Sequence, residues 1–168
     1  LDIALRPYVR PVAVQTHDPT HIFFSDGMCN TELNLLLPAL AECEPPVTPE
    51  MLQVYLTARW TSPRAWRATN AMRDVFSAQR LKHFRRVGTV QAFASEMMSI
   101  IAPLAHYLSL HPVRLQIPAL IESFVALGVL VRTAARAKVG AASSGDLSAA
   151  LQRHGELFQR AYEGQGIK

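Results

Sequence analysis

The residues that decide the fold are Pro118–Gly140, PALIESFVALGVLVRTAARAKVG. A proline at the first helical position lacks only an N–H that would have no intrahelical partner, so it favours a helix start. Apolar side chains then occupy nearly every position through Val131, and a helix that is apolar on all sides has to lie inside a fold. Cations and then a glycine close the helix, as its negative C-terminus favours. We therefore expect a central core helix here, with buried side chains at Leu120, Phe124, Leu127 and Val131.

The segments on either side of this stretch also predict helices. Before it, apolar residues recur at heptad-like spacing over 90–108, with Thr89 as a suitable N-cap and Pro103 as an expected kink. The pair His111-Pro112 predicts the end of that helix. After it, the loop GAASSGD precedes an amphipathic helix that is expected from about Asp146 to Tyr162.

The first half of the chain contains three further helix starts. Thr31 is a suitable N-cap for an apolar run that Pro38 is expected to interrupt. Thr48-Pro49 and Ser62-Pro63 each combine a capping hydroxyl with a proline at the first helical position. The apolar stripe of the last of these helices shifts register, which predicts a bend or break near Gln79 before the helix ends at Gly88.

The first thirty residues predict no helix. Three prolines, at positions 7, 11 and 19, remove backbone donors and favour extended geometry. The sequence therefore predicts an all-α protein with a single helical bundle-like domain of five or six helices over residues 31–163. An extended N-terminal arm over residues 1–30 precedes this domain, and a short flexible C-terminal tail over residues 164–168 follows it. The arm is expected either to cover the core of its own domain or to reach a neighbouring subunit.

Composition restricts the class of protein. A chain of 168 residues, 49% of them hydrophobic, can bury a core without disulfides or metal. Two cysteines, Cys29 and Cys43, are too few for a disulfide framework and suit a reducing compartment. The longest apolar run, 117–131, is interrupted and shorter than the ~20 residues that cross a bilayer. We expect an intracellular protein, or one inside a virion-like assembly, with no membrane partner; the start at Leu1 without a methionine suggests a processed or trimmed piece.

Charge is segregated along the chain. Residues 1–58 carry two bases and seven acids, whereas residues 59–86 carry eight bases and a single acid, Asp74. Solvated helix faces usually mix the two signs, because like charges at neighbouring positions repel. Seven of the eight bases are arginine, whose forked guanidinium suits phosphate or carboxylate. The candidate nucleic-acid-binding residues are Arg59, Arg64, Arg67, Arg73, Arg80, Lys82, Arg85 and Arg86.

Three interpretations of this basic segment remain open. It could face the phosphates of a nucleic acid, the carboxylates of a protein (including the acidic front of this same chain), or only solvent. Trp60 and Trp66 lie within it, and aromatic rings between arginines are typical of single-strand binding grooves, so both are candidates for base stacking. A tryptophan beside apolar stripe positions is also typical of a core.

No catalytic or metal-binding motif stands out. His17 and His21 are separated by Pro19, so they do not share a helix face, and neither cysteine has a close partner. His154 has no matched acid or nucleophile at a recognisable spacing, and there is no phosphate-binding glycine loop. We therefore expect no enzyme activity, no cofactor, no metal and no small-molecule substrate.

The leading hypothesis is a non-enzymatic assembly protein that binds single-stranded nucleic acid, with RNA as the expected ligand, and other copies of itself. Its arm, helical core, basic segment and tail are arranged as in helical nucleocapsid and coat proteins, which is an analogy of architecture alone. The alternative is a helical interaction or scaffold domain whose basic helices bind an acidic protein partner.

Overall fold

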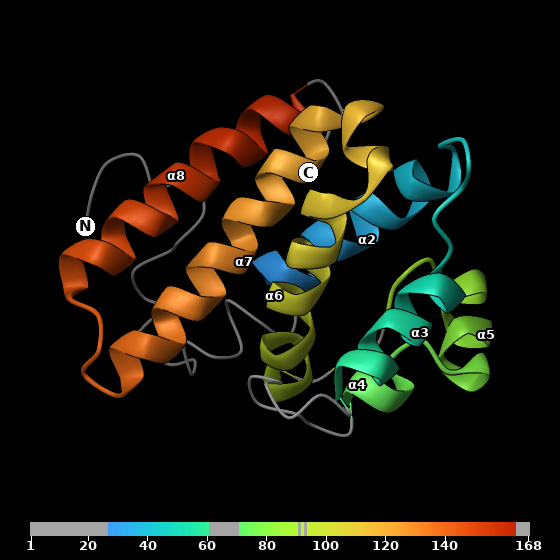
Figure 1. Cartoon of the computed structure of the whole chain (residues 1–168), viewed down its shortest axis with the longest axis horizontal. Coiled ribbons are helices and arrows are strands. Elements are labelled where there is room, and N and C mark those ends of the chain that lie inside the picture. Colours follow the sequence, from blue (N-terminus) through green and yellow to red (C-terminus); the bar gives the residue numbers. More distant parts are fainter. Residues whose placement is uncertain (1–26, 61–70, 91, 93, 164–168) are drawn as a thin grey trace.

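A computed structural model of the protein describes residues 27–60, 71–90, 92 and 94–163. Every regular element in these residues is a helix, which confirms the all-α class (Figure 1). Seven α-helices lie in the described residues instead of five or six, because the described part of the segment that was expected to bend or break near Gln79 contains two helices, 71–74 and 78–87. In chain order the elements are α2 (Met28–Ala41), α3 (Pro49–Trp60), α4 (Ala71–Asp74), α5 (Ala78–Val87), α6 (Ala94–Leu110), the 3-10 helix η3 (Pro112–Leu115), α7 (Pro118–Lys138) and α8 (Ser144–Tyr162).

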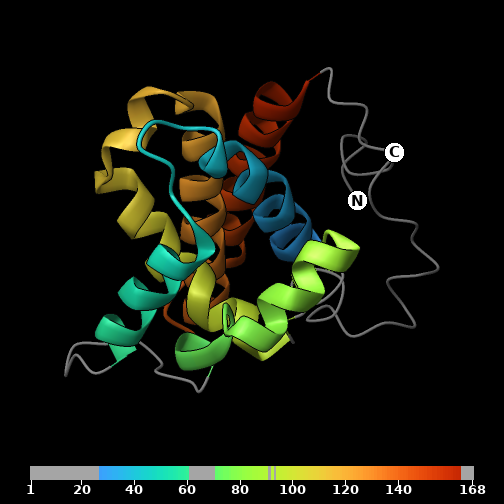
Figure 2. The same cartoon turned by 90° about the vertical axis from the view of Figure 1, so that its right-hand side faces the viewer.

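The apolar helix α7 lies between α6 and α8 (Figure 1) and also contacts α2. Phe124, Leu127 and Val131 are buried as expected, whereas Leu120, in the first turn, is half-buried. On the other side of α6 lie α3, α4 and α5, and Figure 2 shows α3 and α5 next to one another at the near end of the molecule. The described part of the basic segment therefore lies on the opposite side of α6 from the α7–α8 pair.

The packing of α6 on α7 depends on one glycine. A Cβ atom built on Gly128 would lie 2.6 Å from the Cβ of Ala105, which is closer than side-chain carbons approach one another. The two helices therefore approach closely at this point because neither residue carries a larger side chain.

The α2 helix differs from expectation at both its start and its middle. It begins at Met28 rather than after Thr31, so its first turn occupies the last residues of the expected arm. Pro38 lies inside the helix and does not interrupt it. The buried leucines around it provide the reason, since Leu36, Leu37 and Leu40 all face the core and their burial outweighs one lost backbone hydrogen bond.

The start of α6 also differs from expectation. The helix begins at Ala94, so Thr89 is not its N-cap. Val90 is buried outside the helix, and its backbone N–H donates to Oδ1 of Asn34 at 2.8 Å. A tertiary hydrogen bond thus satisfies this backbone donor outside the helix, and the apolar spacing over 90–108 extended the expected helix too far.

Other helix ends agree with the local signals. Thr48 precedes α3, and its Oγ1 accepts from the N–H of Met51 at 3.4 Å. Gly88 ends α5 with a positive φ of 78°, a conformation that glycine adopts without a Cβ clash. The α8 helix starts two residues before Asp146, because Ser143 is its N-cap and exchanges hydrogen bonds with Asp146 in a capping box.

Three further expectations concern residues that the structure does not describe. They are the expected arm over residues 1–26, the tail at 164–168 and the helix start at Ser62-Pro63. One described helix, α7, is long and apolar enough by length and composition to cross a membrane. A core helix meets the same test, and here α7 packs against α2, α6 and α8.

Candidate functional site

Six of the eight predicted basic residues lie on three short helices, and the other two lie outside the described residues. Arg64, Trp66 and Arg67 lie outside the described residues, and the side chain of Trp60 is likewise not described. Arg59 is exposed in the last turn of α3, and Arg73 is exposed on α4. The other four bases, Arg80, Lys82, Arg85 and Arg86, lie on α5.

Helix α5 separates apolar and basic residues onto different faces. Leu81 is buried and Phe84 is half-buried, so these two residues attach the helix to the core. Lys82, Arg85 and Arg86 are all exposed, and their spacing of three and four residues places them on one side of the helix. We call these three residues the basic face.

Arg80 does not belong to the basic face. Its guanidinium donates to both carboxylate oxygens of Glu96 on α6, at 3.0 and 2.9 Å, and it also lies 3.9 Å from Asp74. The hydrogen bond to Glu96 raises the pKa of Arg80, and its side chain is 26% exposed. A bidentate, partly buried ion pair of this kind links α5 to α6. The charge of Arg80 is therefore already paired inside the protein.

Arg85 has a weaker tie to the chain. Its Nη2 lies 3.1 Å from a carboxylate oxygen of Glu50 on α3, but the two side chains are 73% and 53% exposed. Exposed ion pairs stabilise proteins by only about 0–1 kcal/mol, since water competes for both charges. Arg85 therefore remains accessible to an external anion. The pair also shows that the acid-rich residues 1–58 and the basic residues 59–86 contact one another within one molecule.

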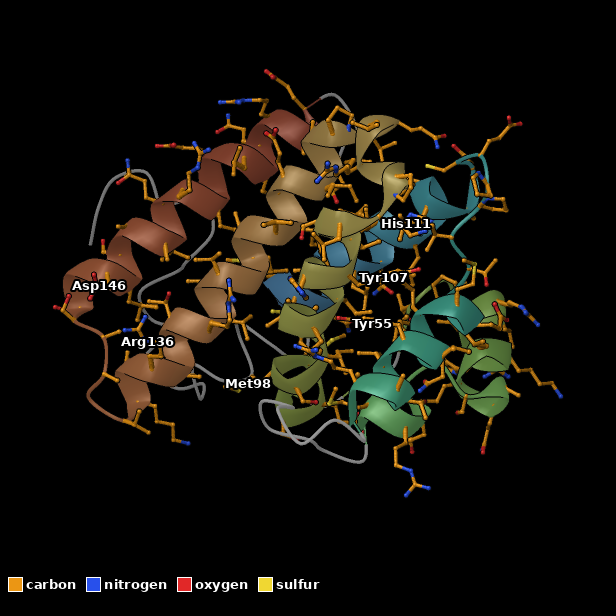
Figure 3. The ribbon with its side chains drawn as sticks, viewed as in Figure 1. Tyr55, Met98, Tyr107, His111, Arg136 and Asp146 are labelled. Atoms are coloured by element: carbon orange, nitrogen blue, oxygen red, sulfur yellow. The ribbon has the colours of Figure 1, made fainter. Side chains whose placement is uncertain are left out.

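A row of aromatic rings, which the sequence did not indicate, crosses from α3 to α6. The ring centroids of Tyr55 and Tyr107 are 4.5 Å apart, and those of Tyr107 and His111 are 5.2 Å apart. All three side chains are half-buried, and Figure 3 shows them following one another between the two helices. No local signal could have joined Tyr55 to Tyr107, because they lie on different helices far apart in the chain.

The buried polar cluster around Glu32 gives His154 an acid partner that no sequence spacing indicated. Nε2 of His154 on α8 lies 2.6 Å from Oε2 of Glu32 on α2. The hydroxyl of Ser123 on α7 donates to the other carboxylate oxygen at 2.6 Å. All three residues are buried, so one carboxylate joins three helices. The partners are too far apart in sequence for any spacing rule to pair them.

This cluster has the residue types of a hydrolase triad but not its arrangement. The carboxylate lies between the hydroxyl and the imidazole, whereas nucleophile activation needs the imidazole in the middle. The buried neighbour Cys29 does not supply a nucleophile either, because burial, and then the charge of Glu32, raise the pKa of its thiol. Its arrangement and burial therefore favour a structural role for this cluster.

Two further groups have no site chemistry among the described residues. Cys29 and Cys43 are both free and buried. No group of three or more His, Cys, Asp and Glu side chains that could hold a metal occurs in the described part of the chain. His17 and His21 lie outside that part.

Comparisons with known proteins add no family: no family model, no curated protein and no solved structure matches this chain.

Proposed function

We propose that the protein is a non-enzymatic assembly protein that binds the phosphate backbone of single-stranded nucleic acid through the basic face of α5. The observation that carries this proposal is the joint exposure of Lys82, Arg85 and Arg86 on one side of a single helix. A helix rises about 1.5 Å per residue, so these cations span less than one and a half turns and can contact neighbouring phosphates together.

The electrostatics of the neighbouring residues support this proposal. Arg59 and Arg73 add exposed positive charge on α3 and α4, which lie near α5. The exposed pair between Arg85 and Glu50 costs little to break, so a phosphate can replace the carboxylate. Binding of this kind does not depend on base sequence, because every nucleotide carries the same phosphate.

The test compares two triple variants that remove the same charge. In the first, the basic face is changed by Lys82→Ala, Arg85→Ala and Arg86→Ala. The control is Arg132→Ala, Lys138→Ala and Arg160→Ala, which removes three exposed cations from α7 and α8. Both variants and the wild type are titrated with labelled single-stranded RNA and DNA at several salt concentrations.

The first variant should bind all oligonucleotides more weakly. Its plot of log K against log salt should be shallower by ~0.7 for each phosphate contact that it loses. The control variant should keep most of the wild-type slope. Equal losses in the two variants would mean that only net charge matters, and a wild type that does not bind at low salt would contradict the proposal.

A second candidate function is a scaffold domain whose basic helices bind an acidic protein. The observation that favours it is the pairing of Arg80 with Glu96 and of Arg85 with Glu50, since carboxylates already bind guanidinium groups of this segment. A polyglutamate peptide of the same charge as the oligonucleotide separates the two candidates. The scaffold function predicts tight peptide binding that the basic-face variant loses, together with weak oligonucleotide binding from the start.

A further inference from the structure

The row of rings from Tyr55 through Tyr107 to His111 lies at the surface of the protein. The interplanar angles are 32° and 45°, so successive rings are tilted against one another. Tyr55 and Tyr107 pack against the core, yet all three side chains are only half-buried, so each keeps part of its surface exposed. In Figure 3 the three labels follow one another along the front of the molecule.

Exposed apolar side chains lie one helical turn from two of these rings. Met51 precedes Tyr55 by one turn of α3 and is 40% exposed, and Leu110 follows Tyr107 by one turn of α6 and is 68% exposed. Residues three or four apart lie on the same side of a helix, so each of these side chains lies on the same side of its helix as the neighbouring ring. Exposed apolar side chains that gather near partly exposed rings mark an interaction surface more often than scattered apolar residues do.

A cation, Arg59, lies beside the row of rings. Arg59 follows Tyr55 by one turn of α3 and is exposed. Burial raises the pKa of Tyr55, and the charge of Arg59 acts in the opposite direction, which places the guanidinium near the phenol. Flat rings next to an arginine fit a ligand that presents a flat ring on an anionic chain.

We propose that Tyr55, Tyr107 and His111 form a base-stacking strip for single-stranded nucleic acid, with Arg59 as its phosphate contact. This inference rests on the proposed function and adds to it the part of the site that contacts the bases. Bases stack on aromatic side chains without sequence preference, as backbone-led binding requires. Helix α3 contacts both the aromatic row and the basic face, since its Tyr55 packs on Tyr107 of α6 and its Glu50 pairs with Arg85 of α5.

The experiment follows the logic of a double-mutant cycle: it removes a protein ring, the bases of the ligand, or both, and compares the binding affinities. Wild type, Tyr107→Phe and Tyr107→Leu are titrated with a single-stranded RNA and with an abasic oligonucleotide of the same length and charge. Tyr107→Leu should bind the RNA about tenfold more weakly, as is usual when one stacked base is lost. Tyr107→Phe should bind it as the wild type does, because the ring stacks and the hydroxyl does not.

The abasic oligonucleotide separates stacking from misfolding and from charge. It should bind the wild type and Tyr107→Leu equally, and the salt dependence of the Leu variant should be unchanged. A Leu variant that loses affinity for both ligands alike would show damage to the fold and would overturn the stacking site. Tyr55→Leu, at the other ring of the first pair, repeats the test on a different helix.

The outcomes for this strip and for the basic face are distinct. If Tyr107→Leu and Tyr55→Leu bind RNA like the wild type while the basic-face variant loses salt dependence, the stacking strip is wrong and the proposed function stands. If the Leu variants instead change self-association and leave RNA affinity unchanged, the strip is a protein contact and the inference is also wrong. A wild type that binds neither ligand at low salt contradicts the proposed function and this site with it.

Discussion

Oε2 of Glu32 lies 2.6 Å from Nε2 of His154 in the protein interior, although 122 residues separate the two along the chain. Ser123 completes the contact on the second carboxylate oxygen, so α2, α7 and α8 meet at one acidic side chain. The Nδ1 atom of His154 and the hydroxyl of Tyr162 are buried nearby without a hydrogen-bond partner among the described residues. Burial, and then the charge of Glu32, raise the pKa of that hydroxyl.

The first prediction concerns this buried pair. Glu32→Leu should lower the free energy of unfolding by about 3–5 kcal/mol, because it leaves the imidazole and the Ser123 hydroxyl buried without their acceptor. The double variant Glu32→Leu/His154→Leu should cost clearly less than the sum of the single changes, since it removes both polar partners. Urea denaturation of the four proteins measures the coupling. His106→Leu, a change at an exposed histidine of α6, is the control, and strictly additive losses would contradict the prediction.

The second prediction concerns the close packing of α6 on α7. Gly128→Ala should lower the free energy of unfolding by about 1–3 kcal/mol, because its Cβ would overlap that of Ala105. Gly155→Ala on α8 is the matched control, since nothing lies within 4 Å of the Cβ that it adds. That change should instead stabilise the protein by about 0.5–1 kcal/mol through helix propensity. Combining Gly128→Ala with Ala105→Gly should recover part of the loss.

The third prediction concerns pH and the start of α8. The backbone N–H and the hydroxyl of Ser143 donate to Asp146, and these bonds, with the charge of Arg136, lower the pKa of Asp146 from 3.8. Figure 3 shows Arg136 and Asp146 at neighbouring ends of α7 and α8. Because the folded state has the lower pKa, the stabilisation is fully present above about pH 4 and is lost as the pH falls through the folded pKa.

An NMR titration of the Asp146 carboxyl should therefore give a midpoint below 3.8. Asp146→Asn, which keeps an acceptor oxygen but cannot titrate, should be less stable than the wild type at neutral pH. That difference should shrink as the medium is acidified below about pH 4. A midpoint at or above 3.8 would show that the capping box does not form in solution.

The fourth prediction separates structural from binding arginines within the basic segment. Arg80→Gln should lower the free energy of unfolding by about 1–2 kcal/mol, because it removes charged hydrogen bonds to Glu96 in a partly buried setting. It should leave the salt dependence of oligonucleotide binding unchanged. Lys82→Gln should do the reverse, with a stability change within about 0.5 kcal/mol and a slope lower by ~0.7. Equal effects of the two changes on the slope would place Arg80 in the binding surface.

Much of the fold could be predicted because helix signals are local. Thr48-Pro49 before α3, Gly88 after α5 and Pro118 at the start of α7 all lie within a turn of the ends that they determine. An N-cap or a left-handed glycine acts on backbone groups a few residues away, so its effect does not depend on the rest of the molecule. At Pro38 and Thr89 the expectation failed because distant contacts outweighed a local signal.

The candidate site followed the opposite pattern. The sequence by itself determined that the protein is all-α, that α7 is its central helix and that positive charge is concentrated in one segment. Only the tertiary structure decided which of those charges are engaged, since Arg80 meets Glu96 and Lys82 faces outward. It alone also joined Glu32 to His154 and Tyr55 to Tyr107. The physical reason is that local propensities act over about one helical turn, whereas these contacts depend on how whole helices pack around a shared core.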